Sequence, residues 1–380
     1  MFNSLGVLLI TTMMSFPFPG KSWKVIRVGL YNNTPVEQVV FTPVRGSYEI
    51  IGDGNWKGQL NEGDLLYVSY SDTAITIMQK GNPWERLDSI RLVTNREEHR
   101  FLLRPVGRNL DVRVYPGNCL FGPGAGGLLM VNEVPESYYL AGVLLAEGGA
   151  AAPKEYYKAQ AILARTFLAA HLHRHTDEGF LVCDETHCQA YHGVDIPDEM
   201  IMQAIRQTRH IIVTDRQGHP IIPAYHSNSG GETATAEKVW LKKIPWLITR
   251  NDPWSKKGPH YCWKREILMK EWITWLEQQG LNENIPASRL SDIHAHRTYT
   301  YRAGNLNIPM QKIRDDWHLP SAFFSVRVKG NMVILDGRGY GHGLGLSQEG
   351  AMEMARKGYS YKKIIRFYYP GTLVKKVKNK

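Results

Sequence analysis

The sequence contains few cysteines and lacks the common motifs of nucleotide-binding and serine-hydrolase proteins. Four cysteines among 380 residues are too few for a disulfide scaffold. The glycine-rich stretch 337–351 contains no G-x-G-x-x-G and no Gly-Lys-Ser/Thr, so it is neither a dinucleotide fingerprint nor a P-loop. No G-x-S-x-G elbow is present. The simplest nucleotide-binding and serine-hydrolase interpretations are therefore excluded.

Long hydrophobic runs are also scarce. The apolar run Leu5–Met14 is too short to cross a bilayer, which takes ~20 residues, but long enough for the core of a signal peptide. We therefore predict a signal-peptide-like segment over residues 1–21 and export to the periplasm or cell envelope. The sequence leaves open whether this segment is cleaved or retained as a membrane anchor. No other segment is apolar over a length that could cross a membrane.

The charge balance is basic. With 46 Lys and Arg against 36 Asp and Glu, the formal net charge is +10, which suits an anionic polymer as partner. A merely basic globular surface is an equal alternative. The basic residues are scattered, apart from the short tail 375–380, and no zinc-finger, RNP or basic-helix pattern is present. We therefore expect no nucleic-acid partner.

The N-terminal part reads as a series of short β-strands. Between Lys24 and about Tyr115, alternating apolar and polar residues are separated by turns rich in Gly, Asn, Asp and Pro. This pattern predicts a β-rich domain over residues 22–118. The stretch 116–127, PGNCLFGPGAGG, has the composition of a boundary between domains.

The remainder mixes helices and strands without a regular βαβ alternation, which favours an α+β fold with antiparallel strands and helices around a substrate cleft. Helices are predicted over 135–147, 154–175 and 264–281, and a hairpin over 326–335. Ser347 and Ser360 are placed to cap two further helices, of which the first runs to Arg356.

The stretch GRGYGHGLG places a glycine at every second position from Gly337 to Gly345. Ordinary strands avoid this arrangement, because each glycine loses conformational entropy on folding and packs nothing. We therefore expect another group to approach this backbone closely.

Glu147 ends an otherwise apolar helix and precedes two glycines. The negative end of the helix dipole and the apolar neighbours both disfavour ionisation, so they raise the pKa of the carboxyl group. A carboxylic acid that stays protonated near neutral pH suits general-acid cleavage of a glycosidic bond. An exposed glutamate at a frayed helix end is the alternative.

Lys158 and Arg165 lie seven residues apart on the next predicted helix, and hence on nearly the same face. If that face lines the cleft of Glu147, both could orient an anionic or polyhydroxyl substrate. Two solvated charges are the alternative, although the apolar neighbours of Arg165 indicate a partner for its charge.

Cysteine and histidine cluster in the segment 171–192. Cys183, His187 and Cys188 provide thiolate and imidazole groups at short spacing, which suits tetrahedral zinc. A disulfide between Cys183 and Cys188 is the alternative in an oxidising compartment.

The segment AYHSNSGGET holds polar residues in a glycine-containing loop that could donate hydrogen bonds to a substrate. The loop contributes the candidates Tyr225, His226, Ser227 and Ser229. Tyr225 and Tyr340 also offer flat faces for sugar rings, although most aromatic side chains belong to the core.

Five blocks of the chain together resemble the stage II sporulation protein D family, also called the SpoIID/LytB domain family, which acts on bacterial peptidoglycan. They are NEVPESYYLAGVLLAEG, YYKAQAILARTF, THCQAYHG, AYHSNSGGETATAEKVW and GRGYGHGLGLSQEGAMEMARKGYSYKKIIRFYYPGT. These blocks lie within residues 128–255 and 336–373, in the order of the family. The resemblance implies a catalytic domain over 119–376, with an insertion at about 256–335.

The resemblance implies a lytic transglycosylase that cuts denuded glycan strands and leaves 1,6-anhydro ends. The family's catalytic glutamate falls on Glu147, which serves as acid and then base, and the supporting basic residues fall on Lys158 and Arg165. Because some members bind zinc, the resemblance also implies a structural zinc ion. Its ligands would be His175, Cys183, His187 and Cys188.

Two other functions remain open from the sequence. One is a non-catalytic wall-binding module that enhances a cell-wall amidase, as relatives in the LytB branch do. The other is a zinc hydrolase. Under the transglycosylase interpretation, the glycines form a cleft wall against which the sugar strand lies, with Gly341 and Gly343 facing the sugar and with Tyr340 and His342 bonding or stacking on it.

Overall fold

A seven-stranded and a six-stranded sheet form the N-terminal part of the computed structural model, which describes residues 25–79, 85–171, 174–282 and 285–377. The first sheet has the order β13-β1-β12-β11-β8-β3-β4 and the second β10-β9-β2-β5-β6-β7. The predicted signal-peptide-like segment lies outside the described residues. The strands run as follows: β1 Val25–Gly29, β2 Gln38–Arg45, β3 Tyr48–Gly52, β4 Asn55–Leu60, β5 Leu66–Ser71, β6 Ala74–Gln79, β7 Glu85–Leu87, β8 Ile90–Val93, β9 Arg100–Pro105, β10 Arg113–Pro116, β11 Asn118–Gly124, β12 Gly127–Pro135 and β13 Val182–Cys183.

Aromatic side chains fill the space between the two sheets. Phe41 stacks on Phe101 and meets Phe121 edge-on, so residues of both sheets share one core. The β-rich character predicted for this part is confirmed. Residues 118–124 of the stretch predicted to be turn-rich form β11, which pairs along its whole length with β12.

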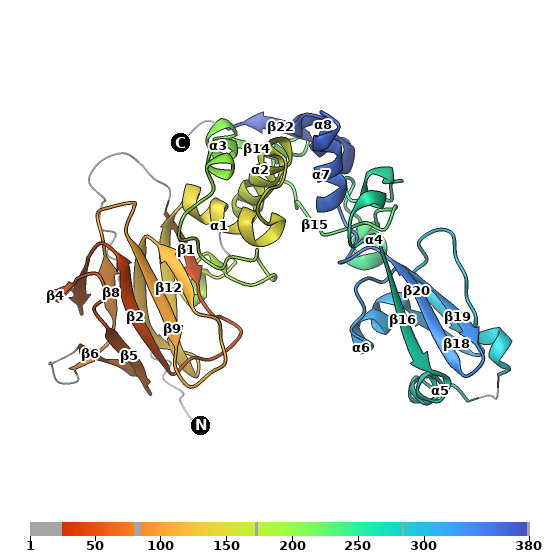
Figure 1. Cartoon of the computed structure of the whole chain (residues 1–380), viewed down its shortest axis with the longest axis horizontal. Helices are drawn as coiled ribbons and strands as arrows, with labels where there is room; N and C mark the ends of the chain where they lie inside the picture. The colour runs from red at the N-terminus through yellow and green to blue at the C-terminus, as the bar shows by residue number, and fades with distance from the viewer. Residues whose placement is uncertain (1–24, 80–84, 172–173, 283–284, 378–380) are drawn as a thin grey trace, which may run out of the picture.

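A helical centre follows the sheets and carries the chain between two outer parts (Figure 1). Helix α1 directly continues β12, and α2 packs against α1, α3 and α8. The helices are α1 Glu136–Gly148, α2 Lys154–Ala170, α3 Glu199–Gln207, α4 Ala236–Val239, α7 Gln348–Arg356 and α8 Tyr361–Tyr368, with short 3-10 turns at Thr176–Glu178 and Pro253–Lys257. Short strands join this centre: β14 Ile211–Thr214 pairs with β22 Leu373–Lys376, and β15 Tyr225–His226 with β21 Leu346–Ser347.

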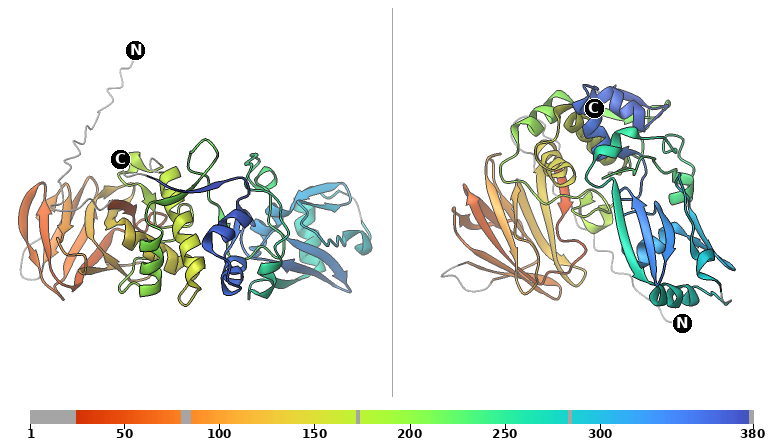
Figure 2. Two further views of the ribbon diagram at one scale, coloured as in Figure 1. Left: turned by 90° about the horizontal axis from the view of Figure 1, so that it is seen from above. Right: turned by 45° about the vertical axis from the view of Figure 1, so that its right-hand side comes forward.

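The second outer part, here called the outer lobe, spans residues 262–338 and has its own hydrophobic core. Trp272, Leu276 and Leu335 belong to a buried cluster separate from that of the sheets and the helical centre. Both outer parts extend from the same side of the helical centre (Figure 2). The elements of the lobe are β16 Cys262–Leu268, α5 Met269–Gln278, a 3-10 turn at Ala287–Leu290, β17 Thr300–Ala303, β18 Leu306–Pro309, α6 Met310–Asp316, β19 Phe324–Lys329 and β20 Met332–Arg338.

The α+β class predicted from the sequence is confirmed, and three local predictions need correction. Residues 262–268 form β16 and pair with β20, so of the predicted helix 264–281 only Met269–Gln278 is helical. Helix α2 ends at Ala170 instead of extending to residue 175. Ser347 caps α7 by accepting from the N–H of Gly350, whereas Ser360 precedes α8 without a side-chain capping bond.

Candidate functional site

Glu147 lies in a pocket of about 430 Å³ between the end of α1 and the start of α7. The pocket also receives Ser227 from the loop after β15 and a segment that leads into the outer lobe. Among the described residues its lining consists of Glu147, Gly148, Ser227, Lys257, Gly258, Pro259, His260, Gln348, Glu349, Met352, Glu353 and Arg356.

The end of α1 fixes the position of the Glu147 carboxyl group. Gly149 ends the helix with φ +67 and donates its N–H to the carbonyl of Leu145. A Cβ on Gly148 would lie 2.7 Å from the Tyr156 hydroxyl, so the helix end packs against α2 only because residue 148 has no side chain. Gly148 therefore allows the close approach of the helix end that carries the half-buried carboxyl group, and Gly149 ends the helix.

Burial raises the pKa of Glu147, as the sequence predicted, and two hydrogen bonds oppose that rise. Oε1 accepts from the backbone N–H of Ala190 at 3.2 Å, and Oε2 accepts from the Gln348 amide at 3.5 Å. Because burial is the largest of these effects, the carboxyl group holds its proton to a higher pH than an exposed glutamate does. That is the state required of a general acid.

A second acidic residue, Glu349, faces the same pocket and is paired with His260. The Glu349 Oε1 atom lies 2.5 Å from His260 Nδ1, and the Glu349 side chain is largely buried. The Ser227 hydroxyl lies 3.5 Å from the same Nδ1 atom. In a Ser-His-acid triad the hydroxyl and the carboxylate bind opposite ring nitrogens, so this arrangement is not one.

Lys158 and Arg165 do not line the pocket of Glu147. The Lys158 ammonium pairs with Glu155 at 2.6 Å on the same helix. Arg165 is buried, pairs with Glu136 at 2.7 Å and donates to the backbone carbonyls at the end of α3. The expectation that both side chains share the cleft with Glu147 is therefore corrected, because Lys158 pairs within α2 and Arg165 joins α2 to α1 and to the end of α3.

The four candidates from AYHSNSGGET differ in burial: His226 and Ser229 are buried, and Tyr225 and Ser227 are less so. Ser227 lines the pocket, and the Tyr225 hydroxyl accepts from the Gln189 amide at 3.0 Å. His226 is buried and donates Nδ1–H to the carbonyl of Leu344, while the Ser229 hydroxyl donates to buried Asp252 at 2.7 Å. Buried side chains cannot bind a sugar from solution, so the prediction of substrate binding is corrected for His226 and Ser229.

The alternating glycines approach protein groups, which corrects the prediction that they form a wall for sugar. A Cβ on Gly341 would lie 2.9 Å from the Cβ of His226, and one on Gly343 would lie 3.0 Å from the Arg297 guanidinium. Both glycines have positive φ, +101 and +82. The bare backbone is thus needed to pack the 339–345 segment against the loop after β15 and against the outer lobe.

The two other candidates of this segment, Tyr340 and His342, differ in exposure. The Tyr340 side chain is about half exposed (49%), and its ring meets that of His260 at 5.2 Å beside the pocket. His342 is half-buried, with its ring near those of His226 and Trp240. Burial lowers the pKa of His342 to about 4, and Nδ1 accepts the N–H of Leu344, so this imidazole is neutral. Tyr340 is therefore the better placed of the two for contact with a ligand.

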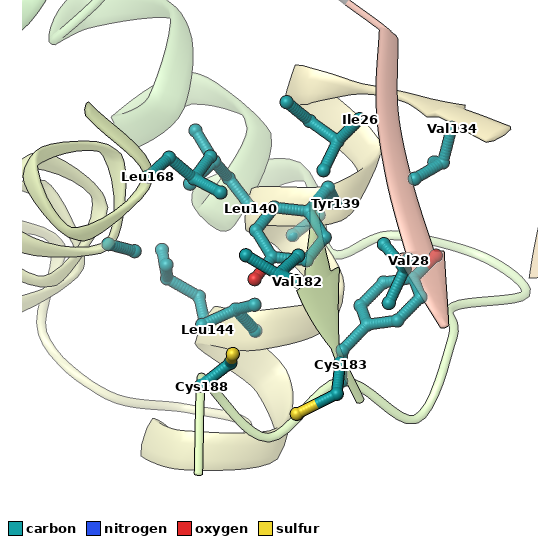
Figure 3. Close-up of a cluster of buried hydrophobic side chains, with 14 of the residues drawn as sticks. Ile26, Val28, Val134, Tyr139, Leu140, Leu144, Leu168, Val182, Cys183 and Cys188 are labelled. Carbon is teal, nitrogen blue, oxygen red and sulfur yellow. The ribbon is translucent and has the colours of Figure 1, made fainter. Parts of the chain in front are cut away.

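All four predicted metal ligands converge. One ligand atom each from His175, Cys183, His187 and Cys188 lies within 4.8 Å of the others. Cys183 ends β13, and Cys188 follows in the next loop beside the buried Tyr139 and Leu144 (Figure 3). No disulfide joins the two cysteines.

The donor atoms fit a tetrahedral zinc ion. Bonds of about 2.0–2.3 Å place the ligand atoms of such an ion about 3.3–3.8 Å apart. Here Cys188 Sγ lies 3.4 Å from His175 Nε2, and Cys183 Sγ lies 3.7 Å from His187 Nδ1. Glu178 binds the other nitrogen of His175 at 2.5 Å, the carboxylate–histidine arrangement typical of metal ligands.

The pKa values of the two thiols shift in opposite directions. A hydrogen bond from the Cys188 thiol lowers the pKa of Cys183 to about 4, and the same bond raises the pKa of Cys188 well above its usual range. Cys183 is therefore the ready thiolate of the pair. Zinc would require both sulfur atoms to be deprotonated, because thiolate is the form that binds metal.

The loop that carries the Cys/His cluster also holds Glu147. Ala190, whose N–H donates to the carboxyl group, follows Cys188 by two residues. Between them, Gln189 accepts from the Tyr139 hydroxyl and donates to that of Tyr225. The cluster therefore fixes the segment that positions the acid.

Sequence reasoning missed the residues that complete the pocket. Gln348, Glu349 and His260 come from parts of the chain far from Glu147, and none belongs to a motif with an evident chemical role. The one available signal for the first two was their position directly after Ser347, because a capped helix start presents its first side chains next to the preceding loop.

Known proteins resemble this chain over the segment that carries the site. A family model described as stage II sporulation protein matches residues 124–214, the stretch that carries Glu147 and the Cys/His cluster. The stage II sporulation protein D of Bacillus amyloliquefaciens is 30% identical over 63% of this chain and 74% of its own length. That of Bacillus subtilis (strain 168) is 30% identical over 64% and 75%.

These similarities place the chain among a family of cell-wall-related proteins. The chain belongs to the stage II sporulation protein D family. It is also 26% identical to a protein of Bacillus subtilis (strain 168) named amidase enhancer, over 63% of this chain and 39% of that protein.

Proposed function

We propose that this protein is a peptidoglycan lytic transglycosylase that cuts denuded glycan strands with Glu147 as the acid. The observation that carries the proposal is the half-buried carboxyl group in a pocket, with a pKa that burial raises. Glu147 gives its proton to the glycosidic oxygen as the bond from that oxygen to C1 of the muramic acid residue breaks. The 6-hydroxyl of the same sugar then bonds to C1 and passes its proton to a general base, a role open to the Glu147 carboxylate left by the first step. A 1,6-anhydro end remains.

Two further parts of the proposal concern a metal ion and the location of the protein. A zinc ion held by His175, Cys183, His187 and Cys188 is structural, because the cluster fixes the loop to Ala190 and does not line the pocket. The protein is exported to the periplasm or cell envelope, where its substrate lies. Among the described residues, no helix combines the length and apolarity needed to cross a membrane.

The test compares wild-type protein with Glu147→Gln on denuded glycan strands, with 1,6-anhydro products measured by mass spectrometry. The amide is isosteric with the acid but cannot give a proton, so product should form with the wild type and fall by at least about 10²-fold in the variant. The exposed Glu199→Gln serves as the matched control and should match wild type. Equal product from Glu147→Gln would remove the residue from the mechanism.

The alternative is a non-catalytic wall-binding protein that enhances an amidase. The similarity to the protein named amidase enhancer favours it. In that case the wild type forms no anhydro product, while adding it to a cell-wall amidase raises peptide release from intact wall, equally with Glu147→Gln.

A further inference from the structure

His260 and Glu349 form a hydrogen-bonded pair on the wall of the Glu147 pocket. His260 lies in the segment that leads into the outer lobe, and Glu349 lies in the first turn of α7. Gly258 lets that segment press onto the acid, because a Cβ there would lie 1.9 Å from Glu349 Oε2 and 2.6 Å from the Asn228 amide. The pair therefore depends on a close backbone contact between elements far apart in the sequence.

The hydrogen bonds around Glu349 fix it as an acceptor. Asn228 Nδ2 donates to Oε2 at 2.6 Å, and the orientation of that amide is set because its oxygen accepts from the N–H of Gly230 at 2.8 Å. The backbone N–H of His260 also points to Oε2, at 3.3 Å. Oε1 is left to accept from His260 Nδ1.

This pairing decides which ring nitrogen of His260 is free. When Nδ1 carries the proton and donates it to Glu349, Nε2 of the neutral ring bears a lone pair. The imidazole is about half exposed, at 52%, and the Tyr340 ring lies against it with centroids 5.2 Å apart. His260 lines the cavity that holds Glu147, and Nε2 is the ring nitrogen that Glu349 does not bind.

We propose that His260, oriented by Glu349, is the base that takes the proton from the attacking 6-hydroxyl group while Glu147 acts as the acid; this rests on the proposed function. The C1–O bond to the leaving sugar breaks, and its oxygen takes the proton of Glu147. The bond from O6 to C1 forms, and the O6 proton passes to His260 Nε2. Solvent then restores the proton of Glu147 and removes that of His260, so no further reactant is needed.

A separate base has a physical advantage over one carboxyl group in both roles. A protonated Glu147 cannot accept a proton until it has given up its own. His260 has a second ring nitrogen that Glu349 does not bind, and this atom can accept the O6 proton during the same step. Glu349 stabilises the imidazolium that forms, as a buried carboxylate does for a catalytic histidine.

The first test uses His260→Gln and Glu349→Gln, with the rate of anhydro product as readout. We expect loss of the base to slow the reaction by about 10²-fold or more. Glu349→Gln should slow it less, because the imidazole remains but loses its orienting charge. His296→Gln is the matched control, since His296 forms a similar pair with Glu232 at 3.0 Å outside the pocket, and it should keep the wild-type rate.

The pH profile of kcat/KM separates a catalytic from a structural role. The wild type requires neutral His260 and protonated Glu147, so its rate should fall at both low and high pH. His260→Gln should lose the fall at low pH and keep the fall at high pH. The charged or titratable groups around His260 are Glu349, Glu353 and Arg356 on α7, Lys257 before it, Tyr340 beside it and Glu147 across the pocket.

The outcomes separate this inference from the proposed function. If the wild type makes anhydro product, and His260→Gln makes it at the same rate with both limbs intact, the histidine is not the base. If His260→Gln is slower but keeps both limbs, its role is structural and the inference is overturned. If the wild type makes no anhydro product, the proposed function itself fails.

Discussion

Glu147 shows how one carboxyl group acquires an unusual pKa from its position. Its burial follows from the apolar sequence of α1 and from the two glycines after it, and the sequence alone was enough to predict the direction of the shift. The opposing hydrogen bonds from Ala190 and Gln348 were not predictable, because they come from a loop 43 residues away and from the start of α7, 201 residues away. Local apolarity can be read from the chain, whereas long-range donors cannot.

A raised pKa at Glu147 predicts a pH-dependent cost of burying its charge. Below the pKa of the unfolded chain, about 4.3, the group is protonated in both states and the folded protein bears no cost. As the pH rises through the folded-state pKa, the carboxylate must ionise inside the pocket and stability is lost. We therefore expect Glu147→Gln to raise the free energy of unfolding at pH 8, with a gain that shrinks toward pH 4, as measured by urea unfolding. A variant less stable than wild type at pH 8 contradicts this.

At the scale of elements, the alternating glycines illustrate a sequence pattern correctly judged unusual and wrongly explained. The pattern predicted a close approach to bare backbone, and that approach exists. The approaching groups are the loop after β15 and the outer lobe instead of a sugar. The alternating glycines indicate that another group comes close, but they do not identify it. For Gly341 that group is His226, which lies more than 100 residues away in the chain.

The glycine segment gives a prediction about stability. Gly341→Ala combines positive φ with a Cβ only 2.9 Å from His226, whereas Gly330→Ala in the hairpin has positive φ with nothing within 4 Å. The backbone term costs about 1–2 kcal/mol at each site. The clash should add roughly 1–3 kcal/mol at Gly341. Chemical unfolding of both variants measures the difference, and equal losses refute the packing role.

The Cys/His cluster predicts that the protein binds zinc and that the zinc stabilises the fold. The purified protein should carry about one zinc per chain by elemental analysis, and Cys183→Ser should lose it and lower Tm by at least about 5 °C, because binding energy at such a site is also folding energy. Cys262→Ser is the matched control, since this cysteine is exposed and outside the cluster. Full metal content and unchanged Tm in Cys183→Ser rule out the site.

Some helix and strand predictions were confirmed, and others were wrong. The hairpin around Gly330 and the helix after Ser347 were predictable because a turn glycine and a capping serine act locally. Residues 264–268 were taken for helix, although they pair with β20 some 70 residues later. Pairing between distant strands overrides a local helical periodicity.

At the scale of the whole molecule, the outer lobe with its own core joins the helical centre beside the pocket. The sequence predicted an insertion over 256–335, but it could not show that Lys257 and His260 at its start complete the wall around Glu147. A segment outside the recognisable motifs thus supplies part of the site. This is the reason that His260, and with it the pairing of Glu349, escaped sequence reasoning.

The central claim is that the chain cuts glycan strands without adding water, and cleavage in water enriched in ¹⁸O tests it most directly. If the 6-hydroxyl of the sugar closes on C1, the new ends are 1,6-anhydro sugars that carry no ¹⁸O, and mass spectrometry finds them in the wild type and not in Glu147→Gln. New reducing ends that are 2 Da heavier show that water attacked C1, and this result contradicts the account.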